Sequence, residues 1–206
     1  MFPLYIQVTF DRIPITFKSY YYDLYAKPKY ATRAGSKIHI PEIKAIIKKE
    51  ETLLEYIIDK NLENFSLTKF KERYAYYSRD LLDIMEADFL NYVYIFLNDE
   101  GMPFLAETIK SGAIDSNAFH LVGDMKMSMK ESLYKKLEEN SLYYAPPYLP
   151  LYAFCEKIKG SIFATLTVME WEQPGTKEGF IKFSKKHYPE KDIEETMQEI
   201  EKWVRS

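Results

Sequence analysis

The sequence predicts an α+β protein: a small N-terminal antiparallel β-sheet packed on a helix, followed by a mostly α-helical body. Residues 4–10 and 13–17 alternate apolar and polar side chains, which is the period of a half-buried strand. From residue 41 onward the apolar side chains recur mostly at helical spacing. Because an isolated hairpin is only marginally stable in water, the sheet needs a covering helix, and we expect residues 41–61 to supply it.

The hairpin is the first element that we expect. Its first strand covers residues 4–10, and residues 11–12 form a short turn into a second, antiparallel strand over residues 13–18. Pro14 has no N–H to donate to a ladder, so the second strand is expected at an edge of the sheet.

Three weaker features separate the hairpin from the central helix. A third strand is expected within residues 20–25, and residues 26–36, rich in Lys, Arg, Gly and Pro, are expected to form a loop. Residues 36–40 are expected to add a short extended piece. The helix over residues 41–61 follows, with an apolar stripe made by Ile43, Ile46, Ile47, Leu53, Leu54, Ile57 and Ile58.

Helical spacing continues through the body. The expected helices cover residues 66–77 (with Ser66 as N-cap), 80–98, 103–110, 117–139, 151–159, 177–187 and 190–204. Within residues 117–139 three methionines alternate with polar residues, as a strand would, but the flanking spacing favours a helix. For residues 162–171 helix and strand both stay open. Residues 143–150 hold three prolines and predict a rigid extended connector.

Two domains follow from this order of elements. We predict a small sheet with its covering helix over residues 1–62 and a helical domain over residues 63–206, with residues 141–150 as a candidate subdivision. Cys155 is the single cysteine and cannot form an internal disulfide. The start of the chain lacks the pattern of a secretory signal, and no apolar run approaches the roughly 18 residues of a membrane span. A cytoplasmic protein without membrane association is therefore expected.

Charge is unevenly distributed along the chain. The net charge is −3, yet residues 1–40 carry six basic and two acidic residues, so the remainder carries −7. Such asymmetry predicts a basic patch on an acidic body. The candidate nucleic-acid-binding residues are Arg12, Lys18, Lys27, Lys29, Arg33 and Lys37. Tyrosines are interleaved with them and could add contacts to a nucleic acid.

No catalytic residue, cofactor site or metal site is predicted. The three histidines are isolated, and His120 with Asp124 offers only two ligands at helical spacing, fewer than a zinc site needs. Cys155 has no histidine near it in the sequence and is expected in the core. No phosphate-binding glycine pattern or GxSxG motif is present. A non-catalytic protein is the favoured interpretation.

One acidic run leaves an alternative open. Asp80, Asp83, Glu86 and Asp88 lie close together in a predicted helix, and carboxylates at i and i+3 can share a Mg²⁺ ion. A solvated acidic helix face explains the same pattern and is the favoured interpretation, because such faces are common.

Two segments carry a resemblance to a known family. LYIQVTFDRIPITFKS, then a basic loop and an amphipathic helix, and then FSLTKFKERYAYYSRDLL resemble the front end of tyrosine recombinases (integrases) of the Bacteroidetes type, over roughly the first 80 residues. Those enzymes begin with a three-stranded arm-type DNA-binding domain and a helical core-binding domain, so the resemblance implies DNA binding.

The resemblance stops before the family's catalytic residues. Those enzymes carry an arginine, a His-x-x-Arg pair and a nucleophilic tyrosine, whereas here the three histidines are followed three residues later by Glu42, Gly123 and Glu190. The resemblance therefore implies a recombinase-derived accessory protein that cannot cleave DNA.

The sequence leaves two hypotheses for the function of this protein. The favoured hypothesis is binding of double-stranded DNA through the basic N-terminal sheet. The alternative is a helical protein–protein interaction module whose exposed tyrosines and prolines form a surface for a protein partner or a second copy of the chain.

Overall fold

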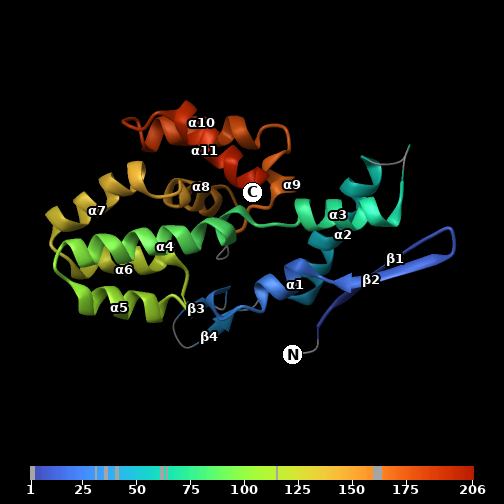
Figure 1. The fold of residues 1–206 in the computed structure, drawn as a ribbon, viewed down its shortest axis with the longest axis horizontal. Coiled ribbons are helices and arrows are strands. Elements are labelled where there is room, and N and C mark those ends of the chain that lie inside the picture. Colours follow the sequence, from blue (N-terminus) through green and yellow to red (C-terminus); the bar gives the residue numbers. More distant parts are fainter. Residues whose placement is uncertain are drawn as a thin grey trace. The chain divides into compact units, whose positions relative to one another are not determined.

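The computed structural model describes residues 3–30, 32–34, 37–39, 42–60, 63, 65–114, 116–159 and 164–206, with the backbone alone for 32–34, 37–39 and 159 (Figure 1). The fold class is confirmed: an N-terminal antiparallel sheet packs on a helix, and a mostly helical body follows. The chain forms two compact units. The first comprises Met1–Arg79 with Thr167–Met169, and the second comprises Asp80–Leu166 with Glu170–Ser206.

The hairpin of the first unit follows the alternation in the sequence. Strand β1 (Tyr5–Phe10) pairs antiparallel with β2 (Ile13–Lys18), with Tyr5 opposite Lys18 and Phe10 opposite Ile13. This sheet has two strands. A separate antiparallel pair is formed by β3 (Thr32–Ala34) and β4 (Lys37–His39), so β3 lies where the sequence predicted only a loop.

The third strand expected within residues 20–25 is wrong: these residues form helix α1 (Tyr20–Tyr25). Ser19 caps this helix, since its side chain accepts a hydrogen bond from the N–H of Tyr22 at 3.0 Å. Tyr21, Leu24 and Tyr25 are buried, at a helical spacing that outweighs the strand preference of tyrosine. A 3-10 turn, η1 (Pro28–Tyr30), follows.

Helices α2 (Ile43–Asp59) and α3 (Leu67–Tyr77) complete the first unit. The aromatic cover of the hairpin comes from α3, because the Phe17 ring centroid lies 4.6 Å from that of Tyr74 and 6.3 Å from that of Phe70. Helix α2, which we expected to supply that cover, packs against α1 and α3 and buries Ile46, Leu53 and Ile57.

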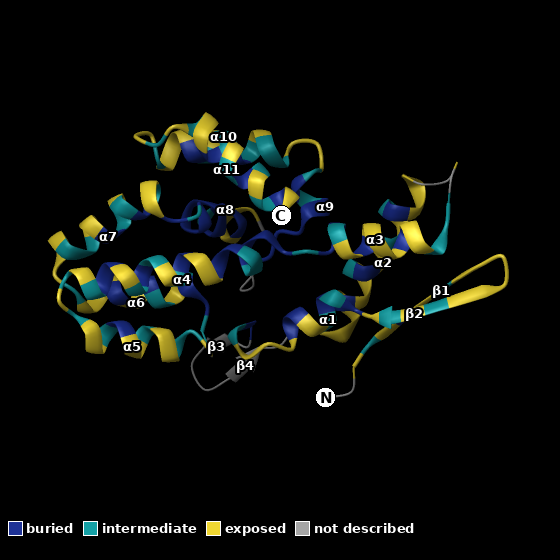
Figure 2. Cartoon of the chain, viewed as in Figure 1, coloured by how far each residue is buried: buried dark blue, intermediate teal, exposed yellow. Residues whose placement is uncertain are grey.

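Helix α4 (Leu81–Asp99) is the centre of the second unit, and it packs against α5, α6, α7, α8 and α11. These helices span Pro103–Gly112 (α5), Ala118–Ser128 (α6), Glu131–Tyr144 (α7), Tyr148–Lys159 (α8) and Ile193–Arg205 (α11). The buried side of α4 includes Phe89, whose ring stacks on that of Tyr148 of α8 at 5.0 Å. Figure 2 shows α8 as one of the most deeply buried helices.

Helices α9 (Val168–Trp171) and α10 (Thr176–His187) precede α11. Trp171 is fully buried and lies 5.7 Å from the ring of Phe180. The sequence left helix and strand open for residues 162–171. In the structure, residues 164–167 are not helical, and the short helix α9 begins at Val168. Among the described residues, no helix is both long and apolar enough to cross a membrane.

Two helix predictions in the body need correction. The single helix expected over 117–139 is two helices, since the chain is extended at Met129 and α7 begins at Glu131. Both helices pack against α4. Residues 143–150 are not one extended connector: α7 runs to Tyr144, and α8 begins at Tyr148 with Pro150 in its first turn, where a proline costs no hydrogen bond.

Candidate functional site

The outward side of the hairpin is an exposed polar surface, which we call the ribbon face. It consists of Tyr5, Gln7, Thr9, Pro14, Thr16 and Lys18, which pair across the two strands. All of these side chains are exposed and none is acidic. The opposite side carries Ile6, Val8, Ile15 and Phe17, which are buried or half-buried, and Phe10 and Ile13 near the tip, which are exposed. The alternation that buries one side of the hairpin therefore presents hydroxyl, amide and ammonium groups on the other.

The tip of the hairpin holds Asp11 and Arg12 in the left-handed region, with φ of 51° and 66°. A two-residue turn of this kind matches the twist of the strands, but it favours glycine or asparagine, and a larger side chain costs roughly 1 kcal/mol. Both residues are exposed. The turn thus places the Arg12 guanidinium at the far end of the ribbon face from Lys18, at a cost in backbone strain.

The remaining candidate basic residues follow the hairpin in sequence. Lys27 is exposed after α1, and Lys29 is half-buried with its Nζ 5.4 Å from the ring centroid of Tyr30. Arg33 lies in β3 and Lys37 in β4, whose side chains are outside the described part of the chain. Among the candidates, the structure brings Arg12 and Lys18 into one hairpin.

The two compact units have formal net charges of opposite sign. Met1–Arg79 contains 14 basic and 9 acidic residues, a formal charge of +5, and Thr167–Met169 adds none. The second unit contains 14 basic and 22 acidic residues, a formal charge of −8. Helix α3 carries a formal charge of +2 and α2 one of −1, so residues 41–79 add a single positive charge to the +4 of the first forty residues.

A buried carboxylate fixes the base of the hairpin. Glu50 of α2 is only 4% exposed and accepts a hydrogen bond from the hydroxyl of Ser19, the residue that follows β2. It also accepts from the N–H of Tyr21 at 3.3 Å and from the hydroxyl of Tyr74 at 3.0 Å. The Tyr74 hydroxyl in turn accepts from the N–H of Tyr20 at 2.9 Å. We call these residues the Glu50 anchor; it joins the end of β2 and the start of α1 to α2 and α3.

The protonation of the anchor follows from its burial. Burial raises the pKa of Glu50, although the hydrogen bonds from Ser19, Tyr74 and Tyr21 act in the opposite direction. Burial and the neighbouring Glu50 carboxylate also raise the pKa of the Tyr74 hydroxyl, so Tyr74 remains a donor. Glu50 was not among the residues predicted from the sequence. A signal was present, because position 50 falls on the spacing of the buried positions 46, 53 and 57.

The acidic run Asp80–Asp88 is split between buried and exposed roles. Asp80 caps α4 and accepts from the N–H groups of Asp83 at 2.9 Å and Leu166 at 2.6 Å. Burial raises the pKa of Asp80 to about 6. Glu86 is buried and accepts from the N–H of Ala118 at 2.7 Å and the hydroxyl of Tyr148 at 3.0 Å. These two carboxylates therefore serve as internal hydrogen-bond acceptors, while Asp88 is exposed.

No three metal-ligating side chains come together within the described ranges. His120 lies in α6 beside aromatic rings, 5.9 Å from the centroids of both Phe119 and Tyr152.

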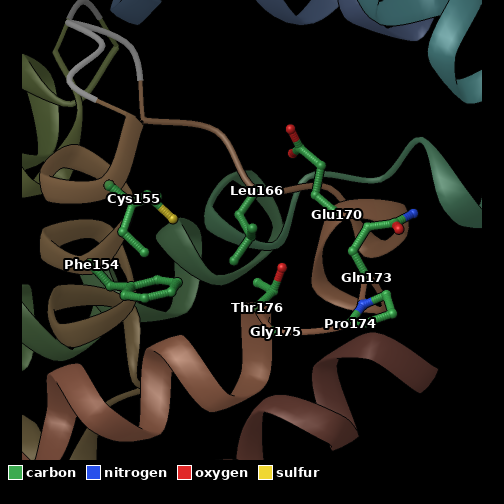
Figure 3. Close-up of a pocket in the computed structure, with 9 residues that line it drawn as sticks. Phe154, Cys155, Leu166, Glu170, Gln173, Pro174, Gly175 and Thr176 are labelled. Atoms are coloured by element: carbon green, nitrogen blue, oxygen red, sulfur yellow. The ribbon is translucent and has the colours of Figure 1, made fainter.

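A pocket of about 460 Å³ lies in the second unit between α8 and the turn that leads into α10 (Figure 3). Phe154, Cys155 and Leu166 line its apolar part, and Glu170 and Thr176 are among its polar lining residues. Cys155 is buried, as expected from the sequence. The described lining is mostly apolar and contains no histidine or lysine beside the thiol.

No protein-family model, curated protein or solved structure matches this chain. The resemblance to tyrosine recombinases therefore stays a prediction that depends on the two sequence segments alone.

Proposed function

We propose that this chain is a non-catalytic DNA-binding protein whose first unit places the ribbon face against double-stranded DNA. The observation that carries the proposal is the composition of that face: exposed Gln, Thr and Tyr side chains without an acid on either strand, with Lys18 at one end and Arg12, beside Asp11, in the turn at the other. The formal charge of +5 on the first unit supports it, because phosphate attraction supplies much of the affinity of DNA-binding proteins.

The shape of the hairpin suits the major groove. That groove is about 12 Å wide and admits a two-stranded β-ribbon. In such a complex Gln7, Thr9 and Thr16 offer amide and hydroxyl groups to base edges. Arg12 at the tip and Lys18 at the base bind phosphates and fix the register.

The Glu50 anchor contributes rigidity to this arrangement. Its hydrogen bonds hold the residues that directly follow β2, so the orientation of the hairpin on α2 and α3 is set before DNA binds. A pre-ordered ribbon loses less conformational entropy on binding than a mobile one.

The test is fluorescence anisotropy with a fluorescein-labelled pool of random 20-base-pair duplexes at low salt. Wild-type protein is expected to bind with an affinity that falls steeply with salt, and Arg12→Glu with Lys18→Glu should weaken binding and flatten the salt dependence. Lys27→Glu with Lys29→Glu should also weaken binding. The control is Lys182→Glu with Lys185→Glu on α10, which makes the same charge change at exposed positions of the second unit.

Two results would overturn the proposal. One is the absence of duplex binding by the wild-type protein at low salt. The other is an equal loss of affinity in the control variant, because net charge alone would then explain the binding.

Protein binding is a second candidate function, and it is favoured by the end of α7. Tyr143 and Tyr144 are 68% and 76% exposed, whereas Tyr148 in the same Tyr/Pro-rich segment is buried. Exposed tyrosines are common at protein interfaces, since their rings bury apolar area and their hydroxyls stay hydrated. Light scattering of the chain alone and of affinity-purified complexes checks for a defined assembly, and a strict monomer without a bound partner contradicts this candidate.

A further inference from the structure

The two exposed tyrosines border a groove in the second unit. Two hollows, of about 620 and 590 Å³, lie next to each other and share Tyr143 and Glu199 in their lining. Helices α4, α7 and α11 supply their described lining. We call the two hollows together the acidic groove.

Aromatic and apolar side chains line much of the acidic groove. Tyr143 and Tyr144 stand at the end of α7, Ile95 of α4 is 50% exposed, and Trp203 of α11 lines the second hollow. Exposed ring faces of this kind attract cations as well as apolar groups.

Carboxylates supply the charge of the groove. Asp88 and Asp99 come from α4, and Glu195 and Glu199 from α11. Lys202 is the one basic residue in the described lining, and none of the four carboxylates forms an ion pair within the described part of the chain. Burial raises the pKa of Glu199, against the opposing charges of Lys191 and Lys202. Lys191 and Lys202 offset part of the charge of Glu195 and Glu199, and Asp88 and Asp99 leave the groove with net negative charge beside exposed rings.

We propose that the acidic groove binds an extended, arginine-rich segment of a partner protein. The guanidinium group is planar, always charged, stacks on aromatic faces and pairs with carboxylates through two parallel hydrogen bonds. The groove offers both kinds of contact along its length. This inference rests on the second candidate function, protein binding, and is independent of DNA binding by the first unit.

Charge complementarity selects this occupant. DNA is repelled by the four carboxylates and by the −8 of the second unit. An uncharged apolar peptide would leave those carboxylates unpaired at the interface, which costs affinity. A second copy of this chain, docking its basic unit, is the remaining occupant and is treated as an outcome of the experiment.

The experiment uses the full chain and two fluorescein-labelled peptides of equal charge, hexaarginine and hexalysine. Hexaarginine is expected to bind at least about threefold tighter, since lysine stacks less well on rings. This preference needs no variant and so does not depend on any variant folding. Asp99→Asn with Glu199→Gln should weaken both peptides by about five- to tenfold. Tyr143→Ala with Tyr144→Ala should weaken hexaarginine more and reduce the preference.

The control is Glu131→Gln with Glu190→Gln, which removes the same charge at exposed positions that do not line the groove. Absence of hexaarginine binding at low salt, equal affinity for the two peptides, or equal weakening by the control variant overturns the proposal. Sedimentation velocity tests whether a second copy occupies the groove instead. If the wild-type protein is a dimer, if Asp99→Asn with Glu199→Gln dissociates that dimer, and if hexaarginine does not, the groove binds a second copy and the proposal of an arginine-rich partner is overturned. If the peptides fail while light scattering finds a complex, protein binding stands and only the partner chemistry is wrong.

Discussion

Replacing Glu50 by alanine is expected to destabilise the protein by about 3 kcal/mol. The carboxylate satisfies three buried donors, the hydroxyls of Ser19 and Tyr74 and the N–H of Tyr21. Each donor that loses its partner in the interior costs at least about 1 kcal/mol. With a urea dependence of about 2 kcal/mol per molar, the unfolding midpoint should fall by about 1.5 M.

Glutamine at position 50 distinguishes hydrogen bonding from charge. Burial raises the pKa of Glu50 above its ordinary value of 4.5, so the folded state holds this proton more tightly than the unfolded state. The stability gained from protonation is therefore complete below about pH 4.5 and is lost as the pH rises through the raised pKa. The glutamine of Glu50→Gln cannot ionise, so the variant does not lose this stability as the pH rises. The free energy of unfolding of Glu50→Gln should therefore increase relative to that of wild type between pH 4 and pH 8.

Urea unfolding followed by far-UV circular dichroism, repeated across that pH range, measures both effects. Glu51→Gln on the same helix is the matched control, because Glu51 is exposed and its pair with Lys48 is a surface contact at 3.5 Å that contributes little. The reasoning is refuted if Glu50→Ala shifts the midpoint no more than Glu51→Gln does. It is also refuted if wild type gains stability over Glu50→Gln as the pH rises.

Three further predictions follow from backbone geometry and capping. Arg12→Gly should stabilise the protein by about 1 kcal/mol, because it creates an Asp-Gly turn, which favours the left-handed backbone at the hairpin tip. The same change should weaken DNA binding. Thermal unfolding measures the first effect and fluorescence anisotropy the second. Gly175→Ala should cost about 1 kcal/mol, since Gly175 has φ of 89°, which an L side chain rarely adopts, whereas Gly123→Ala inside α6 should stabilise by a similar amount. In thermal unfolding, a stabilised Gly175→Ala contradicts the first prediction and a destabilised Gly123→Ala the second. Asp80→Ala should cost about 2 kcal/mol, as it removes the cap of α4 and the acceptor for the Leu166 N–H, and Asp80→Asn should cost less; urea midpoints decide.

Local patterns predicted the hairpin and most helices. The alternation over residues 4–10 and 13–17 gave the strands, and the expected turn at residues 11–12 is where the chain reverses. Ser66, the expected N-cap, does cap α3, and the helix expected from residue 190 begins at Ile193 behind an Asp192 cap that was not predicted. These features depend on neighbouring residues, so one sequence is enough to predict them.

The features that were missed depend on tertiary contacts. A run of three tyrosines at residues 20–22 favours a strand, and only the Ser19 cap and the burial of Tyr21 and Leu24 make it a helix. Helix α2 was read as a stripe of isoleucine and leucine, but its most consequential side chain is Glu50, whose partners lie 24 to 31 residues away in the sequence. The acidic groove joins α4, α7 and α11, which no local pattern brings together.

Variants at Arg12 and Glu50 distinguish two roles of the hairpin, direct contact with DNA and support of the fold. Arg12→Gly should raise stability, because glycine relieves the strained turn, and the proposed phosphate contact of Arg12 predicts a lower DNA affinity. Glu50→Ala should lower stability and also lower affinity, because it releases the base of the same hairpin while leaving every side chain of the ribbon face in place. A hairpin that only supports the fold would instead keep its DNA affinity in Arg12→Gly. Measuring both variants by the same anisotropy and unfolding assays therefore tests whether the ribbon face itself meets the duplex.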